Sequence, residues 1–468
     1  MTSYESFLAN KMIDAPKVGF KPTLPMNPHL FEWQVKIVKW ALEQGRAACW
    51  ADCGLGKGIM ALEWCRHVCD HTGGDALILT PLAVANQFRR EGEKFGIPVT
   101  VVKVDADVRP GINVTNYQRL DGLRDIGRFS AVVCDESDIL ASLFGKLKRL
   151  IIDSFERTPY KLDCSATPAP NDHVELGNHA EFLGIMPPSE MLSRWFVNDA
   201  DVVGHYRLKG HAAADFWRWV SSWATAVSKP SDLGYPDGDF NLPPLEIVDH
   251  CVAVDHSEGR EDGFMFRMPS LSATSLHDEK RLTCEGRAKR AAEIVATKPG
   301  VPWIVWCDTD YEADALKRAM PHAVELRGSE SPESKEAKLE GFIDGTIRVL
   351  ITKPKIAAHG LNLQHCRDTV YVGLSYSFKY FYQSVRRFWR FGQTETVTAH
   401  VVSAETEGRI GETIRRKQAD HDTMKASMVA AMAEFGLGSQ GRRSLGLYEP
   451  TVPMTIPAWL TTSGGVAC

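Results

Sequence analysis

Short β-rich runs that alternate with helical patterns, twice along the chain, are the sequence feature that most constrains the fold. Between residues 46 and 166 we expect strands at "RAACW" (46–50), "ALILT" (76–80), "VTVVKV" (99–104), "SAVVC" (130–134) and "YKLDCS" (160–165). The pattern resumes with "WIVWC" (303–307), "AVEL" (323–326), "IRVLIT" (347–352), "TVYVG" (369–373) and "VTAHVVS" (397–403). Such alternation is typical of a parallel sheet covered by helices. The sequence therefore predicts an α/β protein with two parallel-sheet lobes.

The middle of the chain has a different composition. Four tryptophans are followed there by the Pro/Gly/Asp-rich passage "KPSDLGYPDGDFNLPP", which predicts a helical insertion and then a linker. We therefore expect an N-terminal lead (1–27), a first lobe (28–184), the insertion and linker (185–285), a second lobe (286–420), and a C-terminal helix and tail (421–468). In the tail, "TIPAWL" (455–460) could dock on the body of the protein or on a protein partner, and we expect the body.

The overall composition predicts a soluble, intracellular protein. Of its 468 residues, 44% are hydrophobic and 24% are charged, as in ordinary globular proteins. No apolar run approaches the roughly 18–20 residues needed to span a bilayer. The start, "MTSYESFLANKMIDAPK", lacks a basic segment followed by an apolar one, so we expect no secretory signal.

Charge and cysteine content limit the partners that we expect. A net charge of −5 gives no general attraction to nucleic acid, so any such contact needs a local basic patch. The segment 369–394 lacks Asp and Glu but holds Lys379, Arg386, Arg387 and Arg390. The eleven cysteines fit reduced thiols better than a disulfide framework. Although Cys49, Cys53, Cys65 and Cys69 have a zinc-like spacing, the first lies in a predicted buried strand, and we predict no metal site there.

The stretch "ADCGLGKG" (51–58) has the features of a phosphate-binding loop. Gly54 and Gly56 allow the backbone N–H groups to face a phosphate, and the helix that follows adds positive potential. Lys57 would contact the β- and γ-phosphates. The next residue is usually Ser or Thr, whose hydroxyl holds Mg²⁺, but here it is Gly58. By itself the loop does not distinguish a nucleotide site from a chance arrangement of glycines.

An acidic pair strengthens the case for a nucleotide site. "SAVVCDESD" places Asp135 and Glu136 directly after an apolar strand. At the carboxyl edge of a parallel sheet, Asp135 can hold Mg²⁺ and Glu136 can orient the attacking water. Two acids after a strand could also begin an exposed turn, but the glycine loop upstream favours catalysis.

Two further motifs follow strands of the two predicted lobes. In "CSATPAP" (164–170), Ser165 and Thr167 are positioned to sense the site, although this motif alone could be a plain turn. In "YQSVRRFWRFGQT" (382–394), Arg387 and Arg390 are three residues apart, which predicts a shared helix face. An arginine pair that reaches across a cleft could stabilise charge on the γ-phosphate. The alternative is a helix that only displays basic residues.

These motifs, in this order, resemble those of the superfamily-two helicases and translocases, and within them the Swi/Snf-like group. The resemblance covers roughly residues 28–420. In the first half, "LFEWQ" with Gln34 is similar to the adenine-reading element, "CGLGKG" to motif I, "LILTPLAVANQFRREGEKF" to motif Ia, "VTNYQRL" to motif Ib, "CDESD" to the acidic box and "SATP" to motif III. In the second half, "IVWCDTDYEADAL" is similar to motif IV, "GLNL" to motif V and "QSVRRFWRFGQT" to motif VI. "NDHVELGNHAEFL" (171–183) and the spacing of Gln383, Arg387, Arg390, Gly392 and Gln393 are the parts most typical of the Swi/Snf group.

The resemblance implies two RecA-like lobes that close on ATP and Mg²⁺. Carried over motif by motif, the catalytic residues are Lys57, Asp135, Glu136, Arg387 and Arg390, with Asp135 as the metal ligand. The ATP-binding residues are Gln34, Gly54, Leu55, Gly56, Lys57 and Gly58, and the coupling residues are Ser165, Thr167 and Gln383. The phosphates of DNA, expected to be duplex, would contact Pro81, Asn116, Arg327, Lys355, Gly360 and Asn362. Such contacts are salt-dependent and largely independent of sequence.

The chain departs from the family pattern in three respects. Gly58 removes the hydroxyl that binds Mg²⁺, and although a water could replace it, weaker metal binding or slower turnover is expected. The acidic box ends in Ser137 and Asp138 instead of Ala and His. The insertion is short for a chromatin remodeller, and the compact chain resembles bacterial or bacteriophage members.

Three functions stay open at this point. The first is an ATP-driven motor that tracks duplex DNA, and it is the one that we predict. The second is a strand-separating helicase that acts on DNA or RNA. The third is an ATP-gated DNA-binding subunit whose turnover was weakened by the loss of the hydroxyl at Gly58. The retained Glu136 and both arginines favour a working enzyme over this last alternative.

Overall fold

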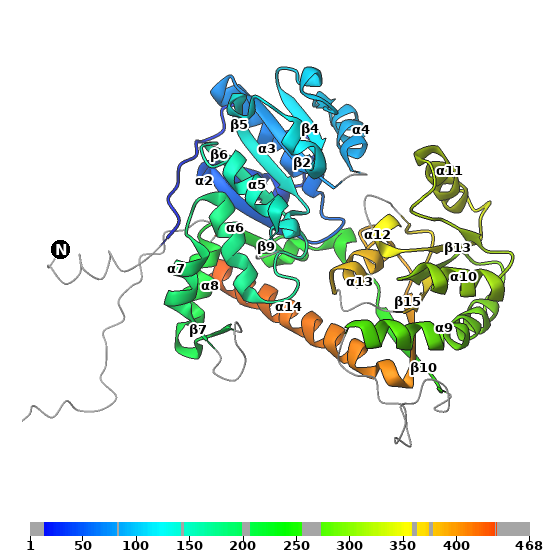
Figure 1. The fold of residues 1–468 in the computed structure, drawn as a ribbon. Helices are drawn as coiled ribbons and strands as arrows, with labels where there is room; N and C mark the ends of the chain where they lie inside the picture. Colours follow the sequence, from blue (N-terminus) through cyan, green and yellow to red (C-terminus); the bar gives the residue numbers. More distant parts are fainter. Residues whose placement is uncertain are drawn as a thin grey trace, which may run out of the picture.

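The computed structural model of this chain describes residues 14–81, 84–141, 145–198, 206–254, 273–357, 363–373, 378–435 and 437. Gly360, Asn362 and the "TIPAWL" segment lie outside these residues. Two α/β lobes make up most of the described structure (Figure 1). Within the described ranges, none of the helices combines the length and the apolar character that a bilayer-spanning segment needs.

The first lobe is built on a seven-stranded sheet with the order β3-β4-β2-β5-β6-β1-β9. Each neighbouring pair of strands is parallel. Because helices cover both faces, the strands are apolar and buried along most of their length. The strands are β1 (Arg46–Ala51), β2 (Asp75–Thr80), β3 (Val99–Val101), β4 (Ile112–Asn116), β5 (Phe129–Asp135), β6 (Tyr160–Cys164) and β9 (Ala224–Val227).

Two apolar cores lie on the two faces of this first sheet. One contains Trp64 and the other contains Trp50, and both side chains are fully buried. The helices of the lobe are α2 (Glu32–Gln44), α3 (Lys57–Thr72), α4 (Ala85–Phe95), α5 (Lys146–Ser154) and α6 (Leu176–Leu183). Short 3₁₀ helices connect them at Asp105–Asp107, Tyr117–Gly122, Ile126–Arg128, Ser137–Ala141 and His173–Glu175.

The second lobe is built on a six-stranded sheet with the order β10-β15-β14-β11-β13-β12, and it too is parallel throughout. Its strands are β10 (Leu245–Val252), β11 (Trp303–Cys307), β12 (Val324–Glu325), β13 (Val349–Thr352), β14 (Asp368–Val372) and β15 (Val397–Ala404). Its helices are α9 (Ala273–Ala296), α10 (Asp310–Ala319), α11 (Pro332–Ile343), α12 (Pro354–Ala357) and α13 (Phe378–Val385). The predicted fold class, two RecA-like parallel-sheet lobes, is confirmed by these two sheets.

The segment expected to form a helical insertion contributes to both lobes. It contains α7 (Pro188–Trp195), the antiparallel pair β7 (Phe196–Asn198) and β8 (Tyr206–Leu208), α8 (Ala213–Ser221), and 3₁₀ turns at Gly210–Ala212, Pro230–Leu233 and Gly238–Phe240. Strand β9 pairs with β1 of the first sheet, and β10 pairs with β15 of the second. The tryptophans of this segment belong to the core of the first lobe, where Trp195 stacks on Trp219 with ring centroids 4.7 Å apart.

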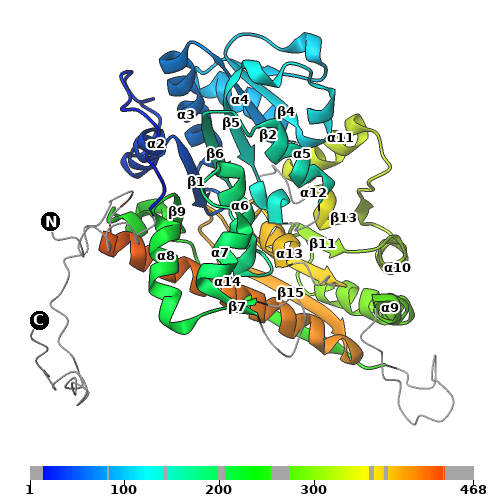
Figure 2. The ribbon, with the colours of Figure 1, turned by 60° about the vertical axis from the view of Figure 1, so that its left-hand side comes forward.

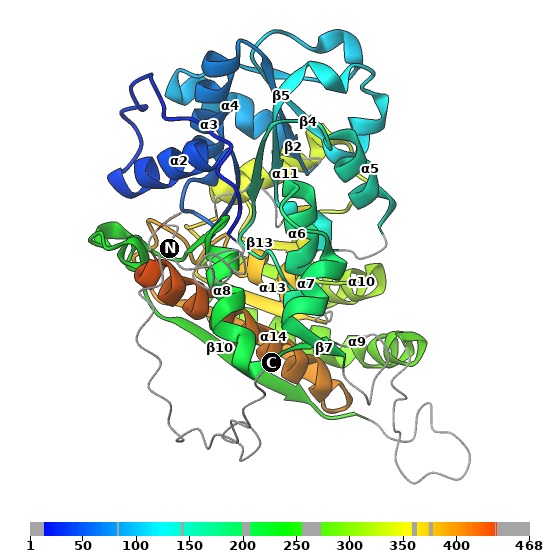
Figure 3. The same cartoon turned by 90° about the vertical axis from the view of Figure 1, so that its left-hand side faces the viewer.

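A long helix, α14 (Gly408–Phe435), connects the two lobes. It begins just after β15 and a 3₁₀ turn at Glu405–Glu407, and its far end packs on α8 and β9 of the first lobe. Figures 2 and 3 show α14 running below the sheet of the first lobe. Met424 and Met428 of α14 are buried in the first lobe's core. The expected boundary between residues 420 and 421 therefore falls inside one continuous helix.

Candidate active site

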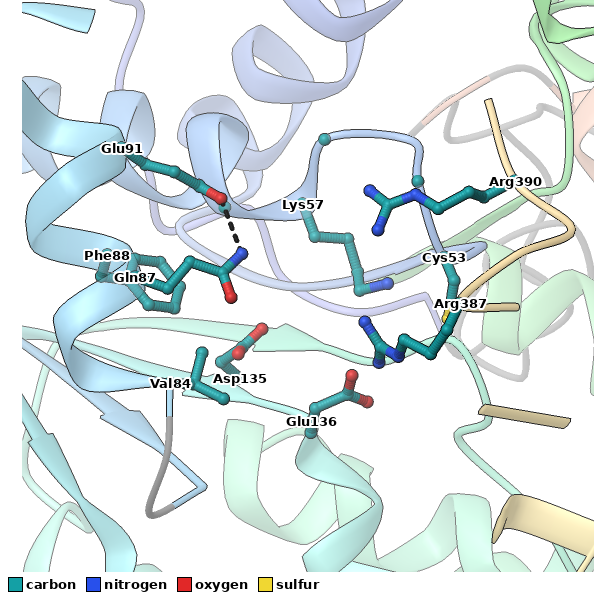
Figure 4. Close-up of a pocket in the computed structure, with 13 residues that line it drawn as sticks. Cys53, Lys57, Val84, Gln87, Phe88, Glu91, Asp135, Glu136, Arg387 and Arg390 are labelled. Carbon is teal, nitrogen blue, oxygen red and sulfur yellow. Dashed lines mark hydrogen bonds between the residues drawn. The ribbon is translucent and has the colours of Figure 1, made fainter. Parts of the chain in front are cut away.

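A cavity of about 120 Å³ lies between the lobes and is lined by residues of both. Figure 4 shows Lys57, Asp135 and Glu136 on one side and two arginines on the other. The lining residues are Cys53, Gly54, Gly56, Lys57, Gly58, Val84, Gln87, Phe88, Glu91, Asp135 and Glu136 of the first lobe, with Arg387 and Arg390 of the second. All five residues predicted to be catalytic thus face one space.

The glycine loop has the backbone that a phosphate-binding loop needs. Gly54 and Gly56 have φ angles of 89° and 77°, a left-handed conformation that is costly for residues with a Cβ atom. Helix α3 begins at Lys57 with Gly56 as its N-cap, so the first N–H groups of the helix lack intrahelical acceptors. The Lys57 Nζ donates a hydrogen bond to the backbone oxygen of Ala51 at 2.9 Å. The loop therefore offers N–H donors and an ammonium group beside the cavity.

Gln34 and Leu55, both predicted to bind ATP, support this loop instead of lining the cavity. The Gln34 Nε2 donates to the backbone oxygen of Leu55 at 2.9 Å, and its Oε1 accepts from the Phe31 backbone N–H at 2.9 Å. A Cβ atom at Gly56 would lie 2.5 Å from the Gln34 Nε2. The bare Gly56 backbone thus allows Gln34 to hold the loop in place.

The two acidic residues stand where β5 ends. Asp135 is the last residue of the strand, and its backbone oxygen accepts a hydrogen bond from the Tyr117 hydroxyl at 2.7 Å. Glu136 has φ 53°, a left-handed conformation that is strained for a residue with a side chain. The sharp turn that this produces directs both carboxylates toward the cavity (Figure 4).

The electrostatics of the first lobe's site fit a bound cation. Burial, followed by the charge of Glu136, raises the pKa of Asp135 to about 8. Burial lowers the pKa of Lys57, but the Cys53 thiol and the two carboxylates outweigh it and leave that pKa above its usual value. A divalent cation would offset the cost of ionising Asp135. Among the described residues, no group of three or more His, Cys, Asp or Glu side chains could hold a metal by itself. Mg²⁺ suits this donor set, because it usually takes one or two carboxylates plus phosphates and waters.

The two arginines reach the cavity from the turn that follows α13. The prediction that they share a helix face is wrong, because α13 ends at Val385 and residues 386–390 form turns. The Nε of Arg387 is buried and has no hydrogen-bond partner among the described residues. Burial, followed by the charge of Arg387, lowers the pKa of Arg390. Two neighbouring cations, one with an unused donor, make this side of the cavity suited to an anion.

Three predicted coupling residues lie in a series of contacts that joins the acidic turn to the second lobe. The Gln383 Nε2 donates to Glu136 Oε2 at 3.2 Å. Ser165 Oγ accepts from the Thr167 backbone N–H at 3.0 Å, and the Thr167 hydroxyl donates to Asp138 Oδ2 at 3.4 Å. The other carboxylate oxygen of Asp138 accepts from Lys379 of the second lobe. The acidic turn is therefore connected to the second lobe at two positions.

Two buried carboxylates that the sequence analysis missed stabilise the same region. Asp52, at the start of the glycine loop, pairs with Arg386 and with Lys425 of α14. No local pattern predicts these contacts, because the partners are 334 and 373 residues away in the chain. The only signal in the sequence was a single acidic residue at the start of the glycine loop.

The second of these carboxylates, Asp163 on β6, connects the strands behind the site. It accepts hydrogen bonds from Trp50 Nε1 at 3.2 Å, from the Ser137 hydroxyl, and from His179 Nδ1 at 2.5 Å. The other ring nitrogen of His179 faces the backbone oxygen of Pro168 at 2.7 Å. Burial lowers the pKa of His179, but Asp163 outweighs it and leaves that pKa raised. Asp163 thus fixes the turn after β5 relative to β1 and α6.

The residues expected to touch DNA phosphates are in different settings. Pro81 follows β2 and is half-buried, and Asn116 ends β4 with only 3% of its surface exposed. Arg327 is paired with Asp314 and, at 2.6 Å, with Glu325. Lys355 lies on α12 with its Nζ 5.6 Å from the Tyr380 ring centroid, beside a small hollow of the second lobe. Asn116 would have to be uncovered to reach a phosphate, and Arg327 would have to leave its carboxylates.

Comparison with known proteins finds a family similar to the second lobe. Residues 286–392 match the family described as the helicase conserved C-terminal domain. Among solved structures, the Sulfolobus solfataricus SWI2/SNF2 ATPase core in complex with dsDNA is similar, with a TM-score of 0.42 and 15% sequence identity, over 88% of this chain and 96% of that chain. No curated protein matches the chain. The family match confirms the predicted resemblance to helicases where motifs IV to VI were assigned.

Proposed function

We propose that this chain, a helicase-like protein with two RecA-like lobes, hydrolyses ATP in the cavity between the lobes and uses the energy to track duplex DNA. The observation that carries the proposal is the lining of that cavity. Lys57, Asp135 and Glu136 reach it from the first lobe, and Arg387 and Arg390 reach it from the second. The helicase C-terminal domain at 286–392 supports the same proposal.

ATP would bind with its phosphates against the glycine loop. The N–H groups at the start of α3 and the Lys57 ammonium supply the donors that a polyphosphate needs. Lys57 would leave the Ala51 oxygen, which it contacts at 2.9 Å, and turn to the phosphates. Mg²⁺ bound with ATP would neutralise charge on the β- and γ-phosphates, and Asp135 would be its protein ligand.

Hydrolysis would depend on residues of both lobes. Glu136 would orient the attacking water, and its carboxylate is held by Gln383 of the second lobe at 3.2 Å. Arg387 and Arg390 would stabilise the charge that spreads over the transferring phosphoryl group. Because the arginines belong to the other lobe, turnover would require the lobes to be closed. Release of phosphate would then remove the anion that holds them together.

The proposed DNA contact rests on local positive charge. The chain as a whole carries a net charge of −5, so only a restricted surface can attract a phosphate backbone. Lys353 and Lys355 both line the hollow of the second lobe, but Lys353 is paired with Asp310 at 2.8 Å, so Lys355 is the cation that we propose for such a contact. Contacts of this kind are independent of base sequence, and they weaken as salt increases.

Steady-state ATP hydrolysis tests the proposal. Turnover would be measured with Mg²⁺ and with no nucleic acid, single-stranded DNA, duplex DNA or RNA, using Glu136→Gln as the inactive control. We expect stimulation by duplex DNA that falls with added salt and disappears in the variant. Stimulation by single strands alone would favour a strand-separating helicase. If ATP binds but is hydrolysed under none of these conditions, the proposed hydrolysis is contradicted. The protein would then be an ATP-gated DNA-binding subunit.

A further inference from the structure

The cavity contains a third carboxylate, which lies in the stretch similar to motif Ia (77–95) and was not among the predicted site residues. Glu91 lies on α4 and lines the cavity together with Asp135, on the same side of Lys57 (Figure 4). Its Oε1 accepts a hydrogen bond from Gln87 Nε2 at 2.9 Å. That bond fixes one carboxylate oxygen and leaves the other free to face the glycine loop.

The second Glu91 oxygen occupies the space beside Gly58. A Cβ atom added at Gly58 would overlap Glu91 Oε2 and would lie 3.1 Å from Glu91 Cδ. Position 58 is where a phosphate-binding loop usually carries the Ser or Thr whose hydroxyl binds Mg²⁺. In this chain residue 58 has no side chain, and the Glu91 carboxylate occupies the volume that a Ser or Thr side chain would fill. Glu91 therefore reaches this position only because residue 58 is glycine.

Close backbone packing holds Glu91 at this position. The next residue, Gly92, is buried where α4 packs on β3. A Cβ atom at Gly92 would overlap the backbone oxygen of Ile97 and would lie 2.7 Å from Val99 Cγ2. The helix can approach β3 this closely because Gly92 has no side chain. Rotation of α4 that would withdraw Glu91 from the cavity is opposed by this packing.

We propose that Glu91 replaces the missing hydroxyl of residue 58 as the second protein ligand of the Mg²⁺ that accompanies ATP. Carboxylate oxygens are preferred Mg²⁺ ligands, and two of them with phosphates and waters complete an ordinary coordination shell. Glu91 comes from α4 and Asp135 from the end of β5, and both line the same cavity. This inference rests on the proposed function, because it assumes that ATP binds beside Lys57.

Metal binding, measured without turnover, tests the role of Glu91. Mn²⁺ would replace Mg²⁺, and its dissociation constant in the complex with a non-hydrolysable ATP analogue would be measured by electron paramagnetic resonance. We expect Glu91→Gln to raise that constant by about tenfold or more. Affinity for the metal-free analogue, measured in EDTA, should not fall. Glu93→Gln is the matched control, because Glu93 lies on the same helix but is 62% exposed and pairs with Arg89.

A rescue variant makes the test specific. Glu91→Ala combined with Gly58→Thr removes the carboxylate and restores the usual hydroxyl. We expect this double variant to bind Mn²⁺ more tightly than Glu91→Ala alone. Gly58→Thr alone should weaken binding, because the new side chain would displace Glu91.

The possible failures are distinguishable. Unchanged Mn²⁺ affinity in Glu91→Gln, with nucleotide still bound, would overturn the role of Glu91 and leave the proposed function standing. If Glu91→Gln loses nucleotide affinity equally with and without metal, the role of Glu91 as a metal ligand is overturned as well. Failure of the unmodified chain to bind the nucleotide would overturn both.

Discussion

Lys379 and Asp138, which lie 241 residues apart in the chain, form an ion pair across the lobes with Nζ and Oδ1 separated by 2.9 Å. The Asp138 side chain has no exposed surface. Burial raises the pKa of Asp138 to about 6, and Lys379 opposes that rise. The acidic turn of the first lobe is thus connected directly to α13 of the second. Asp138 is one of the two residues that replace the Ala and His of the family pattern, and it forms this interlobe contact.

Lys379→Met is expected to weaken closure of the lobes. A hydrogen bond to a charged group contributes about 1.5–3 kcal/mol, so the closed population with a non-hydrolysable ATP analogue should fall by roughly tenfold or more. Energy transfer between fluorophores on the two lobes would measure it. Lys379→Met with Asp138→Asn should close better than Lys379→Met alone, because no buried charge is left unpaired. Equal closure in all three proteins would contradict an interlobe role.

Arg387→Gln should lower the turnover of ATP far more than its binding. Removing an arginine that stabilises the transition state lowers turnover by about 10³-fold, whereas the loop and Lys57 would still hold the phosphates. Arg367→Gln is a suitable control, since Arg367 is exposed and paired with Glu395. Rates and nucleotide affinity would be measured on the same samples. A loss confined to affinity would assign Arg387 to ground-state binding.

Gly54→Ala should disturb the cavity as well as the backbone. At φ 89° an alanine costs about 1–2 kcal/mol, and its Cβ would lie 3.3 Å from the Cβ of Arg390. Gly73→Ala provides the comparison, because Gly73 has φ 65° and nothing within 4 Å of an added Cβ. We expect similar losses in thermal stability but weaker ATP binding only in Gly54→Ala. Equal ATP affinity in the two variants would rule out a specific effect on the cleft.

His421→Phe should make the protein less sensitive to acid. Burial, followed by the charges of Arg386 and His173, lowers the pKa of His421 to about 4, and neither ring nitrogen has a hydrogen-bond partner among the described residues. Because the unfolded chain binds the proton more tightly, the stability due to neutral His421 is complete above its ordinary pKa and is lost as the pH falls toward 4.

Urea unfolding at pH 7 and pH 5 would measure this contribution. Between pH 7 and pH 5 the free energy of unfolding should fall by about 1–2 kcal/mol more in the unmodified protein than in His421→Phe. Phenylalanine keeps the ring contacts with Phe378 and Tyr382, whose centroids lie 5.5 Å and 5.4 Å from that of His421. Identical losses in both proteins would show that other groups cause the acid sensitivity.

Three strands of the first sheet were predictable because each is a short apolar run whose buried character is continuous, whereas the interior strand β4 was missed because polar residues interrupt its apolar run. β1, β2 and β5 lie within one residue of the expected "RAACW", "ALILT" and "SAVVC". Strand β10 was missed, since it lies at the edge of its sheet and its consecutive exposed residues Glu246 and Ile247 break the alternation expected of a half-buried strand. Strand β9 was missed because it has only four residues and follows a tryptophan-rich passage that resembles a helical insertion. Edge position and shortness both weaken the periodic signal on which such predictions depend.

By itself, the sequence determined the two parallel-sheet lobes and the chemistry of residues that are neighbours in the chain. Gly54, Gly56 and Lys57 define a loop, and Asp135 and Glu136 define a strand end, because spacing of a few residues fixes their geometry. Only the tertiary structure decided that Glu91 fills the space beside Gly58, that Asp138 meets Lys379, and that Asp52 meets Lys425. These contacts depend on side chains that approach within a few ångströms after helices and lobes have packed, and no local pattern encodes that packing.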